Sequence, residues 1–230
     1  MDISIRGALG TQLFEYLSGV TQAKKLNRQV ARILINAGGN VVDTVKIDWL
    51  SQIIKLDVPI EIIAGKSKQN VWKSPSLFKD ISDNKSFVNS LQLTRPIQKN
   101  NLKILHVRGT DRTVANINDY VQIAKSIGPD VKFIGDDDYF IDDIQQAIGI
   151  GENISSSAID DWYKCIGASE LYCAFTNFTL SAMLFDPTKK FAMLDRSQAH
   201  GTVSIADQTY DCVQQLFDKY FTNAIWLYKE

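Results

Sequence analysis

Three groups of polar residues, each placed directly after a short apolar run, have the chemistry needed to bind a nucleotide. They begin at Arg108, at Asp136 and Asp137, and at Thr176 with Thr179. An arginine guanidinium is a planar fork that fits phosphate oxygens, and threonine hydroxyls at a helix start add donors to the free backbone N–H groups there. One aspartate of the pair can accept two hydrogen bonds from the edge of a base such as guanine. Together these residue types predict a nucleoside diphosphate site that needs no metal ion.

Each group also has a purely structural interpretation. An arginine after a strand often forms a surface ion pair, and aspartates before a helix more often serve as N-caps. Thr-x-x-Thr at a helix start is capping chemistry in most proteins. The functional interpretation therefore depends on where the three groups lie relative to one another.

The apolar pattern places all three groups at the same edge of one sheet. Short apolar runs alternate with helical periodicity, which is typical of a parallel α/β sheet with helices on both faces. Because ligands bind outside the carboxyl ends of such strands, residues about 70 positions apart can meet one small molecule. The second half is predicted to contain strands at 103–107, 131–135, 170–174 and 190–194 and helices at 118–127, 139–148, 160–168, 177–185 and 207–221.

The first half of the chain predicts a second, smaller α/β unit. A βαβ unit is expected at its start, and the signal weakens from about residue 36 to 99. The expected elements are a strand at 3–5, a helix through Leu13, Leu17 and Val20, a strand at 30–35, a helix at 48–56 and a strand at 59–63. We therefore expect two domains, 1–98 and 99–230.

The segment GALGTQ at 7–12 joins the first strand to the first helix and resembles no common phosphate loop. A P-loop requires a Gly-Lys-Ser/Thr sequence that is absent here, and a dinucleotide loop requires a third glycine and an acidic residue after the next strand, where Asn36 and Ala37 stand. We expect a tight turn that includes Gly10, with Gln12 presenting its amide to the cleft between the domains.

Composition limits the possible partners. The 25 basic and 26 acidic residues give a net charge of -1, so no overall field attracts nucleic acid or an anionic membrane. No apolar run reaches the roughly 18 residues of a membrane span, and we expect a cytoplasmic protein. Three widely spaced cysteines and two histidines predict reduced thiols and no metal centre.

Four blocks of the sequence resemble the bacterial α-1,2-fucosyltransferase family, in the family's order. GALGTQLFEYLSG at 7–19 is similar to its G-G-L-G-N-Q-M-F-Q-Y opening, and HVRGTDR at 106–112 to the H-x-R-R-x-D motif that it shares with α-1,6- and protein O-fucosyltransferases. VKFIGDD resembles its strand with paired acids, and CAFTNFTLSAML its A-N-S-T-F-S-W-W-G-A block. The chain departs from the family at three of these blocks. Gly109 stands where the motif has its second arginine, and Thr11 stands where the opening block has an asparagine. Leu180 and Ser181 stand where the last block has two tryptophans.

The resemblance implies a GT-B-like glycosyltransferase with two Rossmann-like domains facing a cleft, which transfers fucose from GDP-fucose with inversion and without a metal or other cofactor. It implies a glycan acceptor of the bacterial surface, and peripheral membrane association is compatible with it. Carried onto this sequence, it places His106 and Arg108 at the donor, Asp136 or Asp137 at the guanine and Thr176 with Thr179 at the diphosphate. Asp111 becomes the candidate general base, with buttressing of its loop as the alternative role.

Other functions stay open at this point. A nucleotide-binding protein without transferase activity is one, because the motif has lost an arginine at Gly109. A transferase that uses another nucleotide sugar is a second. A Rossmann-type oxidoreductase is a third, and the missing acidic residue after the second strand argues against it.

Overall fold

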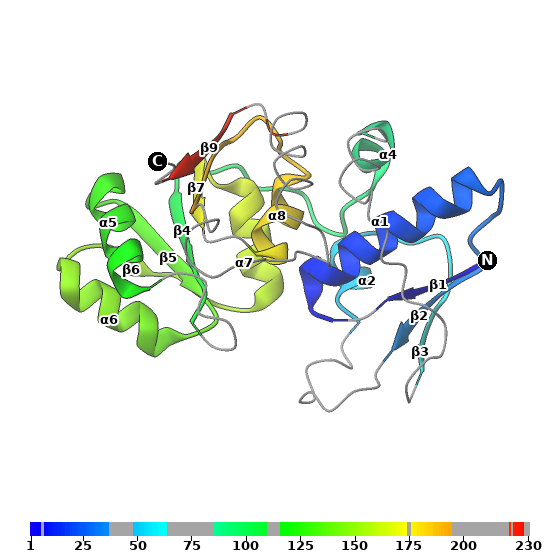
Figure 1. Ribbon diagram of the computed structural model, residues 1–230, viewed down its shortest axis with the longest axis horizontal. Helices are drawn as coiled ribbons and strands as arrows, with labels where there is room; N and C mark the ends of the chain where they lie inside the picture. Colours follow the sequence, from blue (N-terminus) through cyan, green and yellow to red (C-terminus); the bar gives the residue numbers. More distant parts are fainter. Residues whose placement is uncertain are drawn as a thin grey trace. The chain divides into compact units, whose positions relative to one another are not determined.

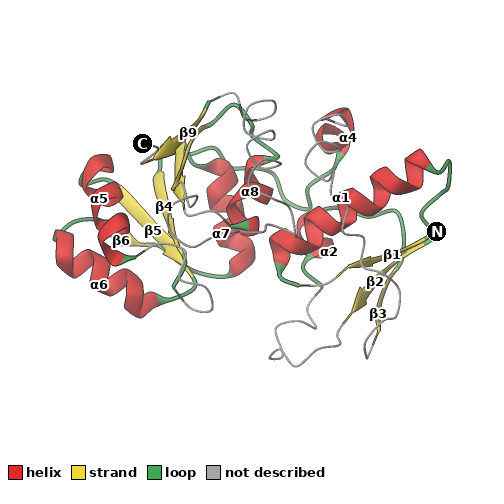
Figure 2. Cartoon of the chain, in the orientation of Figure 1, coloured by secondary structure: helices red, strands yellow, loops and turns green. Residues whose placement is uncertain are grey.

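A computed structural model of the chain describes residues 1–5, 7–36, 48–63, 85–109, 116–173, 176–194, 221 and 223–227. The chain divides into two compact units, which meet along the sequence between Pro96 and Ile97. Both units are α/β, with helices and strands alternating along the chain (Figures 1 and 2). The sequence placed the boundary two residues later, after residue 98.

The first unit is built on a three-stranded parallel sheet of order β1-β2-β3. Its strands are β1 (Asp2–Ile5), β2 (Arg32–Asn36) and β3 (Ile60–Ile63), and its helices are α1 (Leu9–Lys25), α2 (Leu50–Ile53) and α4 (Lys85–Ser90). Helix α1 connects β1 to β2, as the periodicity of Leu13 and Leu17 predicts. Ile3 and Ile5 are fully buried.

A glycine in the middle of α1 allows the helix to lie close to β1. A Cβ atom added to Gly19 would stand only 2.5 Å from Ile3 Cγ2 and 2.9 Å from Ile3 Cδ1. Glycine in a helix interior normally costs about 1 kcal/mol relative to alanine. The close packing of α1 against Ile3 explains why this helix carries it.

The second unit is built on a six-stranded sheet of order β6-β5-β4-β7-β8-β9, in which every pairing is parallel. Its strands are β4 (Lys103–Val107), β5 (Val131–Gly135), β6 (Glu152–Asn153), β7 (Glu170–Cys173), β8 (Lys190–Leu194) and β9 (Ala224–Leu227). Counted from the first strand of this unit, the order is 3-2-1-4-5-6, which is that of a Rossmann sheet. From β4 the strands follow one another outward to β6 on one side, and from β7 outward to β9 on the other, so the switch point lies between β4 and β7.

Helices cover both faces of this sheet (Figure 1). The helices are α5 (Ile117–Ile127), α6 (Asp138–Ile148), α7 (Ala158–Gly167) and α8 (Asn177–Met183). Helices α5 and α6 bury apolar residues against one face, where Leu105, Val107 and Phe133 belong to the same core cluster as Ile141 and Ile144. Helices α7 and α8 lie on the other face (Figure 2).

The structure confirms the predicted fold class at the level of an α/β protein with parallel sheets. The sequence missed β6, β9 and α4, and it extended α2 beyond the single turn that forms. The helix expected at 207–221 lies outside the described residues except for Phe221, which is not helical. Residues 204–219, which the sequence assigned to the second domain, are likewise outside the described part.

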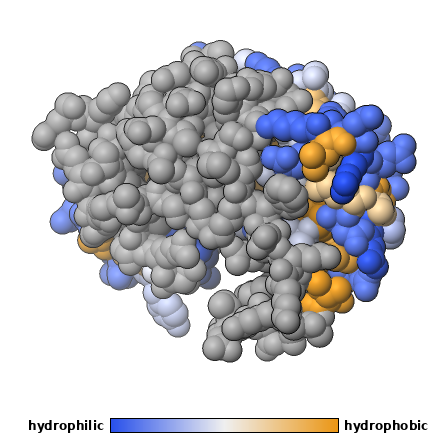
Figure 3. All heavy atoms as spheres, turned by 45° about the vertical axis from the view of Figure 1, so that its right-hand side comes forward, coloured by the Kyte–Doolittle hydropathy of each residue, from blue (hydrophilic) through white to orange (hydrophobic). Residues whose placement is uncertain are grey.

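The described surface carries mixed polarity. In Figure 3, hydrophilic and apolar residues are interspersed over the coloured part of the face shown. Among the described residues, only Leu26, Ile62 and Tyr139 are large apolar side chains classed as exposed. None of the helices in the described ranges combines the length and apolar character needed to cross a membrane.

Replacing Gly19 with alanine tests the packing of α1 on β1. Overpacking a tight site costs about 1 to 3 kcal/mol, whereas the gain in helix propensity is about 1 kcal/mol, so we expect a net loss of roughly 1 kcal/mol in the free energy of unfolding. Urea unfolding measures it. In a chain that already carries Ile3→Ala, adding Gly19→Ala should cause no further loss of stability. A stabilising Gly19→Ala in the otherwise unchanged chain would contradict the packing argument.

Candidate functional site

The candidate site lies at the carboxyl end of β4, where the strand order of the second unit reverses. In open parallel sheets this switch point is where ligands bind, because the connections on its two sides leave in opposite directions. Strand β4 delivers His106 near its end and Arg108 just beyond it, and the next strand on one side, β5, delivers Asp136. On the other side of β4, the chain after β7 places Thr176 at the start of α8.

Arg108, Gly109 and Asp136 form one connected cluster. Arg108 Nη1 and Asp136 Oδ2 make an ion pair at 3.0 Å, and the Gly109 N–H donates a hydrogen bond to Asp136 Oδ1 at 3.1 Å. The backbone N–H of Arg108 donates to the hydroxyl of Tyr120 at 3.1 Å. Two of the three polar groups that the sequence singled out are therefore in direct contact.

Gly109 is enclosed by the turn between β5 and α6. A Cβ atom at this position would lie 2.9 Å from Asp137 Cβ and 3.1 Å from Phe140 Cβ. Any larger residue would push the turn away from β4. The glycine that replaces the second arginine of the fucosyltransferase motif therefore fits the local backbone, and the site has one motif guanidinium instead of two.

Each of the three consecutive aspartates after β5 has its own partner inside the protein. Asp136 binds Arg108 and Gly109, as described above. Asp137 is the N-cap of α6 and accepts a hydrogen bond from the Phe140 N–H at 3.1 Å. Asp138 accepts one from Asn153 Nδ2 at 3.0 Å. The capping alternative thus describes Asp137, and both expected guanine ligands already accept hydrogen bonds from within the protein.

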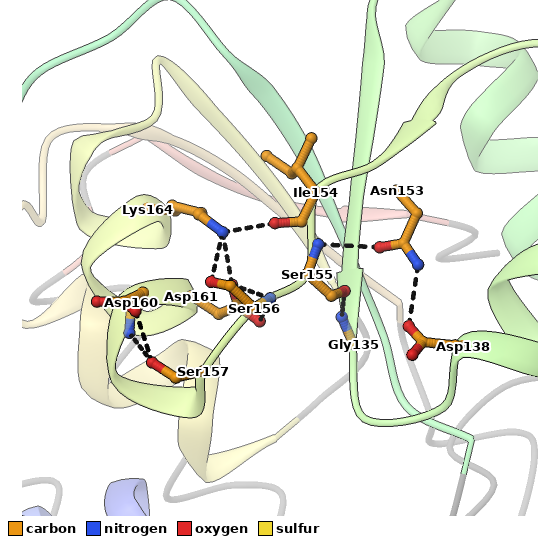
Figure 4. A network of polar contacts seen from close by, with 10 residues as sticks. All are labelled: Gly135, Asp138, Asn153, Ile154, Ser155, Ser156, Ser157, Asp160, Asp161 and Lys164. Atoms are coloured by element: carbon orange, nitrogen blue, oxygen red, sulfur yellow. Dashed lines mark hydrogen bonds and ion pairs between the residues drawn. The ribbon is translucent and has the colours of Figure 1, made fainter.

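The loop after β6 supports this turn, although sequence analysis did not single it out. Asn153 Oδ1 accepts a hydrogen bond from the Ser155 N–H at 2.9 Å, and Ser155 Oγ accepts one from the Gly135 N–H at 3.0 Å. Figure 4 shows these contacts continuing to Asp138. The loop therefore holds the end of β5 on the side away from β4.

An ion pair between the buried Asp161 and the partly exposed Lys164 fixes the other end of the same loop. Asp161, in the first turn of α7, accepts hydrogen bonds from the Ser156 N–H and hydroxyl, and its Oδ1 lies 2.9 Å from Lys164 Nζ (Figure 4). Ser157 caps α7 by accepting from the Asp160 N–H at 3.1 Å. The sequence predicted this helix from residue 160, two residues after its start at Ala158, and Ser157 followed by Asp160 is the capping signal that marks the start.

Thr176 and Thr179 form a capping pair at the start of α8. Thr176 is the N-cap and its Oγ1 accepts from the Thr179 N–H at 3.3 Å, while the two hydroxyl oxygens lie 2.9 Å apart. Thr179 is completely buried and Thr176 is nearly so. Their hydroxyls are thus engaged with each other and the backbone.

His106 packs α8 onto the sheet. Its ring stacks on Phe178 with centroids 5.1 Å apart and an angle of 17° between the planes. Burial lowers the pKa of His106 to about 4, with the Arg108 charge acting in the same direction and Asp136 opposing it. The imidazole is therefore neutral at pH 7, and its buried Nδ1 has no hydrogen-bond partner within the described part of the chain. His106 is only 4% exposed, so little of it is accessible for the contact with the nucleotide sugar that the resemblance implies.

The expected arrangement at the start of α1 is wrong. Gly10 and Gln12 belong to the first turn of α1 instead of a loop, and the turn glycine is Gly7, with a φ of 79°. Gln12 is completely buried: its Nε2 donates to the Gly7 carbonyl at 2.9 Å, and its Oε1 accepts from the N–H groups of Trp49 and Leu50 at 3.1 and 3.2 Å. Its amide therefore connects α1 to the start of α2.

Two further expectations have no geometry in this structure. Asp111, the candidate general base, lies outside the described residues. Among the described residues, no group of three or more His, Cys, Asp or Glu side chains is arranged to hold a metal ion. The metal-independent reaction stays a prediction.

Comparison of the chain with protein-family models, curated proteins and solved structures found no match.

The neutral, buried state of His106 predicts a specific pH dependence of stability. The unfolded chain binds a proton at this group below pH 6.5 and the folded chain only near pH 4, so stability falls as the pH drops through this window. Between pH 7.5 and 4.5 the loss from this group should be about 2 to 3 kcal/mol.

His106→Phe, which keeps a ring against Phe178, should remove that part of the dependence. Urea unfolding of both proteins at a series of pH values measures it, because titrations common to the two proteins cancel in their difference. Parallel pH profiles for the two proteins would show that His106 titrates alike in the folded and unfolded chains.

Proposed function

We propose that the chain is a glycosyltransferase that transfers fucose from GDP-fucose to a hydroxyl of a bacterial surface glycan. The observation that carries this proposal is the single Arg108 guanidinium beside the switch point of a parallel sheet of order 3-2-1-4-5-6. Parallel α/β units are the building blocks of the GT-B arrangement, which we propose for the two units. The order of the four sequence blocks supports fucose as the donor sugar.

In the proposed reaction the acceptor oxygen attacks the anomeric carbon on the face opposite the diphosphate. A carbon–oxygen bond forms to the acceptor, the bond to the β-phosphate oxygen breaks, and GDP leaves while the acceptor proton passes to a base. Negative charge grows on the diphosphate as the bond breaks. Fixed donors aimed at such charge typically contribute roughly 2.7 to 4 kcal/mol each.

Arg108 is the proposed donor to the diphosphate. The pair with Asp136 holds the guanidinium in one orientation, and the Tyr120 hydroxyl fixes the backbone from which it projects. A guanidinium has five N–H donors in one plane, and the ion pair with Asp136 uses Nη1. The side chain is 28% exposed, so it lies at the surface of the second unit rather than in its core.

The other proposed site residues act mainly by support. Thr176 and Thr179 hold the first turn of α8, and His106 holds that helix against β4. We propose Asp111 as the general base on the strength of the motif alone. The reaction needs no metal in this proposal, because the Arg108 guanidinium takes the role of the cation.

A nucleotide-binding protein without transferase activity is the second candidate function. The observation that favours it is Gly109, whose enclosed position leaves no space for the second motif arginine. A transferase with a different nucleotide sugar is the third. Release of fucose or its transfer from GDP-fucose separates the first candidate from the second, and the nucleotide preference separates it from the third.

Titration calorimetry with GDP, UDP, CDP and dTDP in the presence of EDTA tests the proposed donor. We expect GDP to bind in preference to the others and EDTA to leave its affinity unchanged. Manganese-dependent binding of UDP without binding of GDP would refute both the donor and the absence of a metal.

Arg108→Lys tests the proposed role of the guanidinium. Lysine keeps the charge but provides a single ammonium point, which cannot bridge Asp136 and a phosphate in one plane. We expect at least a tenfold loss of GDP affinity and a 100- to 1000-fold loss of kcat with GDP-fucose, on the order of a lost oxyanion donor. The melting temperature should change little, because Arg108 is not in the core.

Arg32→Lys is the matched control. Arg32 also pairs with carboxylates, Asp2 at 3.0 Å and Glu61 at 2.8 Å, but it lies on the sheet of the first unit. This variant should bind GDP like the unchanged protein. An Arg108→Lys protein that is stable and retains near wild-type turnover would remove Arg108 from the site.

A further inference from the structure

The helix start that packs on Gly109 carries a solvent-exposed aromatic side chain. Tyr139 is 84% exposed, whereas Leu26 and Ile62, the other large apolar side chains classed as exposed in the described ranges, are 51% and 52% exposed. It is the second residue of α6, which begins directly after β5. The Cα–Cβ bonds of a helix tilt toward its N-terminus, which for α6 is the end that follows the carboxyl end of β5.

The turn that leads to Tyr139 is packed directly on Gly109, the residue after Arg108. The backbone of Gly109 approaches so close to Asp137 and Phe140 that a Cβ atom would not fit. The two residues that flank the Asp138–Tyr139 pair in sequence thus touch the residue next to Arg108. In sheets of this strand order a bound nucleotide extends from the first strand to the end of the second, here from β4 to β5.

The polar groups of this turn are already used inside the protein. Both carboxylate oxygens of Asp136 accept from Arg108 and Gly109, Asp137 caps α6, and Asp138 binds Asn153. Each of these contacts fixes the orientation of its carboxylate within the turn. The π-face of a base needs only an accessible aromatic ring, and Tyr139 supplies one in the turn that packs on Gly109.

We propose that Tyr139 is the platform on which the nucleobase of the bound nucleotide stacks. This inference rests on the proposed function, in that it assigns the base end of the same nucleotide site. Asp136, Asp137 and Asp138 then act as positioning residues that keep the turn rigid, and the ring gives affinity for the base. Stacking tolerates different bases, so guanine preference would come from other contacts.

Calorimetric binding of GDP and of inorganic pyrophosphate to the wild type, Tyr139→Ala and Tyr139→Phe tests the proposal. Pyrophosphate has no base and reports the phosphate end alone. Loss of one base–aromatic stack corresponds to about a 5- to 150-fold weaker affinity, so Tyr139→Ala should bind GDP more weakly by that factor and pyrophosphate as the wild type does. Tyr139→Phe keeps the ring and should bind both like the wild type.

Nuclear magnetic resonance of the bound nucleotide gives an independent readout. Stacking on a tyrosine or phenylalanine ring should shift the guanine H8 resonance upfield in the wild type and in Tyr139→Phe, and the shift should be absent in Tyr139→Ala. All three proteins should melt alike, because the side chain is almost fully exposed.

The outcomes distinguish this inference from the proposed function. If the wild type binds GDP and Tyr139→Ala binds it equally well, the stacking proposal is wrong and the nucleotide site remains. If Tyr139→Ala weakens pyrophosphate as much as GDP, the residue supports the phosphate end and the stacking proposal is also wrong. If the wild type binds no nucleotide, both proposals fail.

Discussion

The carboxylate of Asp136 connects the ends of two adjacent strands, and the geometry of the candidate site depends on this connection. One oxygen holds the Arg108 guanidinium and the other accepts from the Gly109 N–H. The first contact orients a charge, and the second fixes the backbone that carries it. Because Gly109 has no side chain, the turn after β5 can pack directly on this segment. The charge at the sheet edge is therefore held by a rigid frame before any ligand binds.

That frame continues from the turn after β5 into the loop after β6 by hydrogen bonds. The cap at Asp137, the Asp138–Asn153 contact and the Ser155–Gly135 contact connect β5 to the loop after β6. The Asp161–Lys164 pair, in which the carboxylate is buried, holds the far end of that loop. The contacts at Asp137 and Ser155 are partly buried, so breaking them would leave a donor or acceptor partly shielded from water. Preorganisation of this type is what electrostatic stabilisation of a leaving group requires.

The two glycine-containing segments after β1 and β4 have different roles despite their similar position after a strand. At the first, the Gln12 amide makes hydrogen bonds to three backbone groups and so joins α1 to α2. At the second, Arg108 remains partly exposed, and the adjacent turn after β5 leads to the exposed Tyr139. In the described part of the chain, side chains suited to a ligand gather at the edge of the second sheet, and Gln12 stabilises the first unit.

The sequence by itself determined the alternation of strands and helices, because the apolar period of each segment reports which face it buries. It also placed Arg108 and Asp136 at one sheet edge, since the carboxyl ends of parallel strands coincide. It missed β6, whose residues Glu152 and Asn153 carry no apolar signal and are held by pairing with β5. Only the tertiary structure decided that Asp137, Thr176 and Gln12 are occupied by capping and backbone contacts. The same side chains can cap a helix or bind a ligand, and the choice depends on which donors the folded chain brings within hydrogen-bond distance.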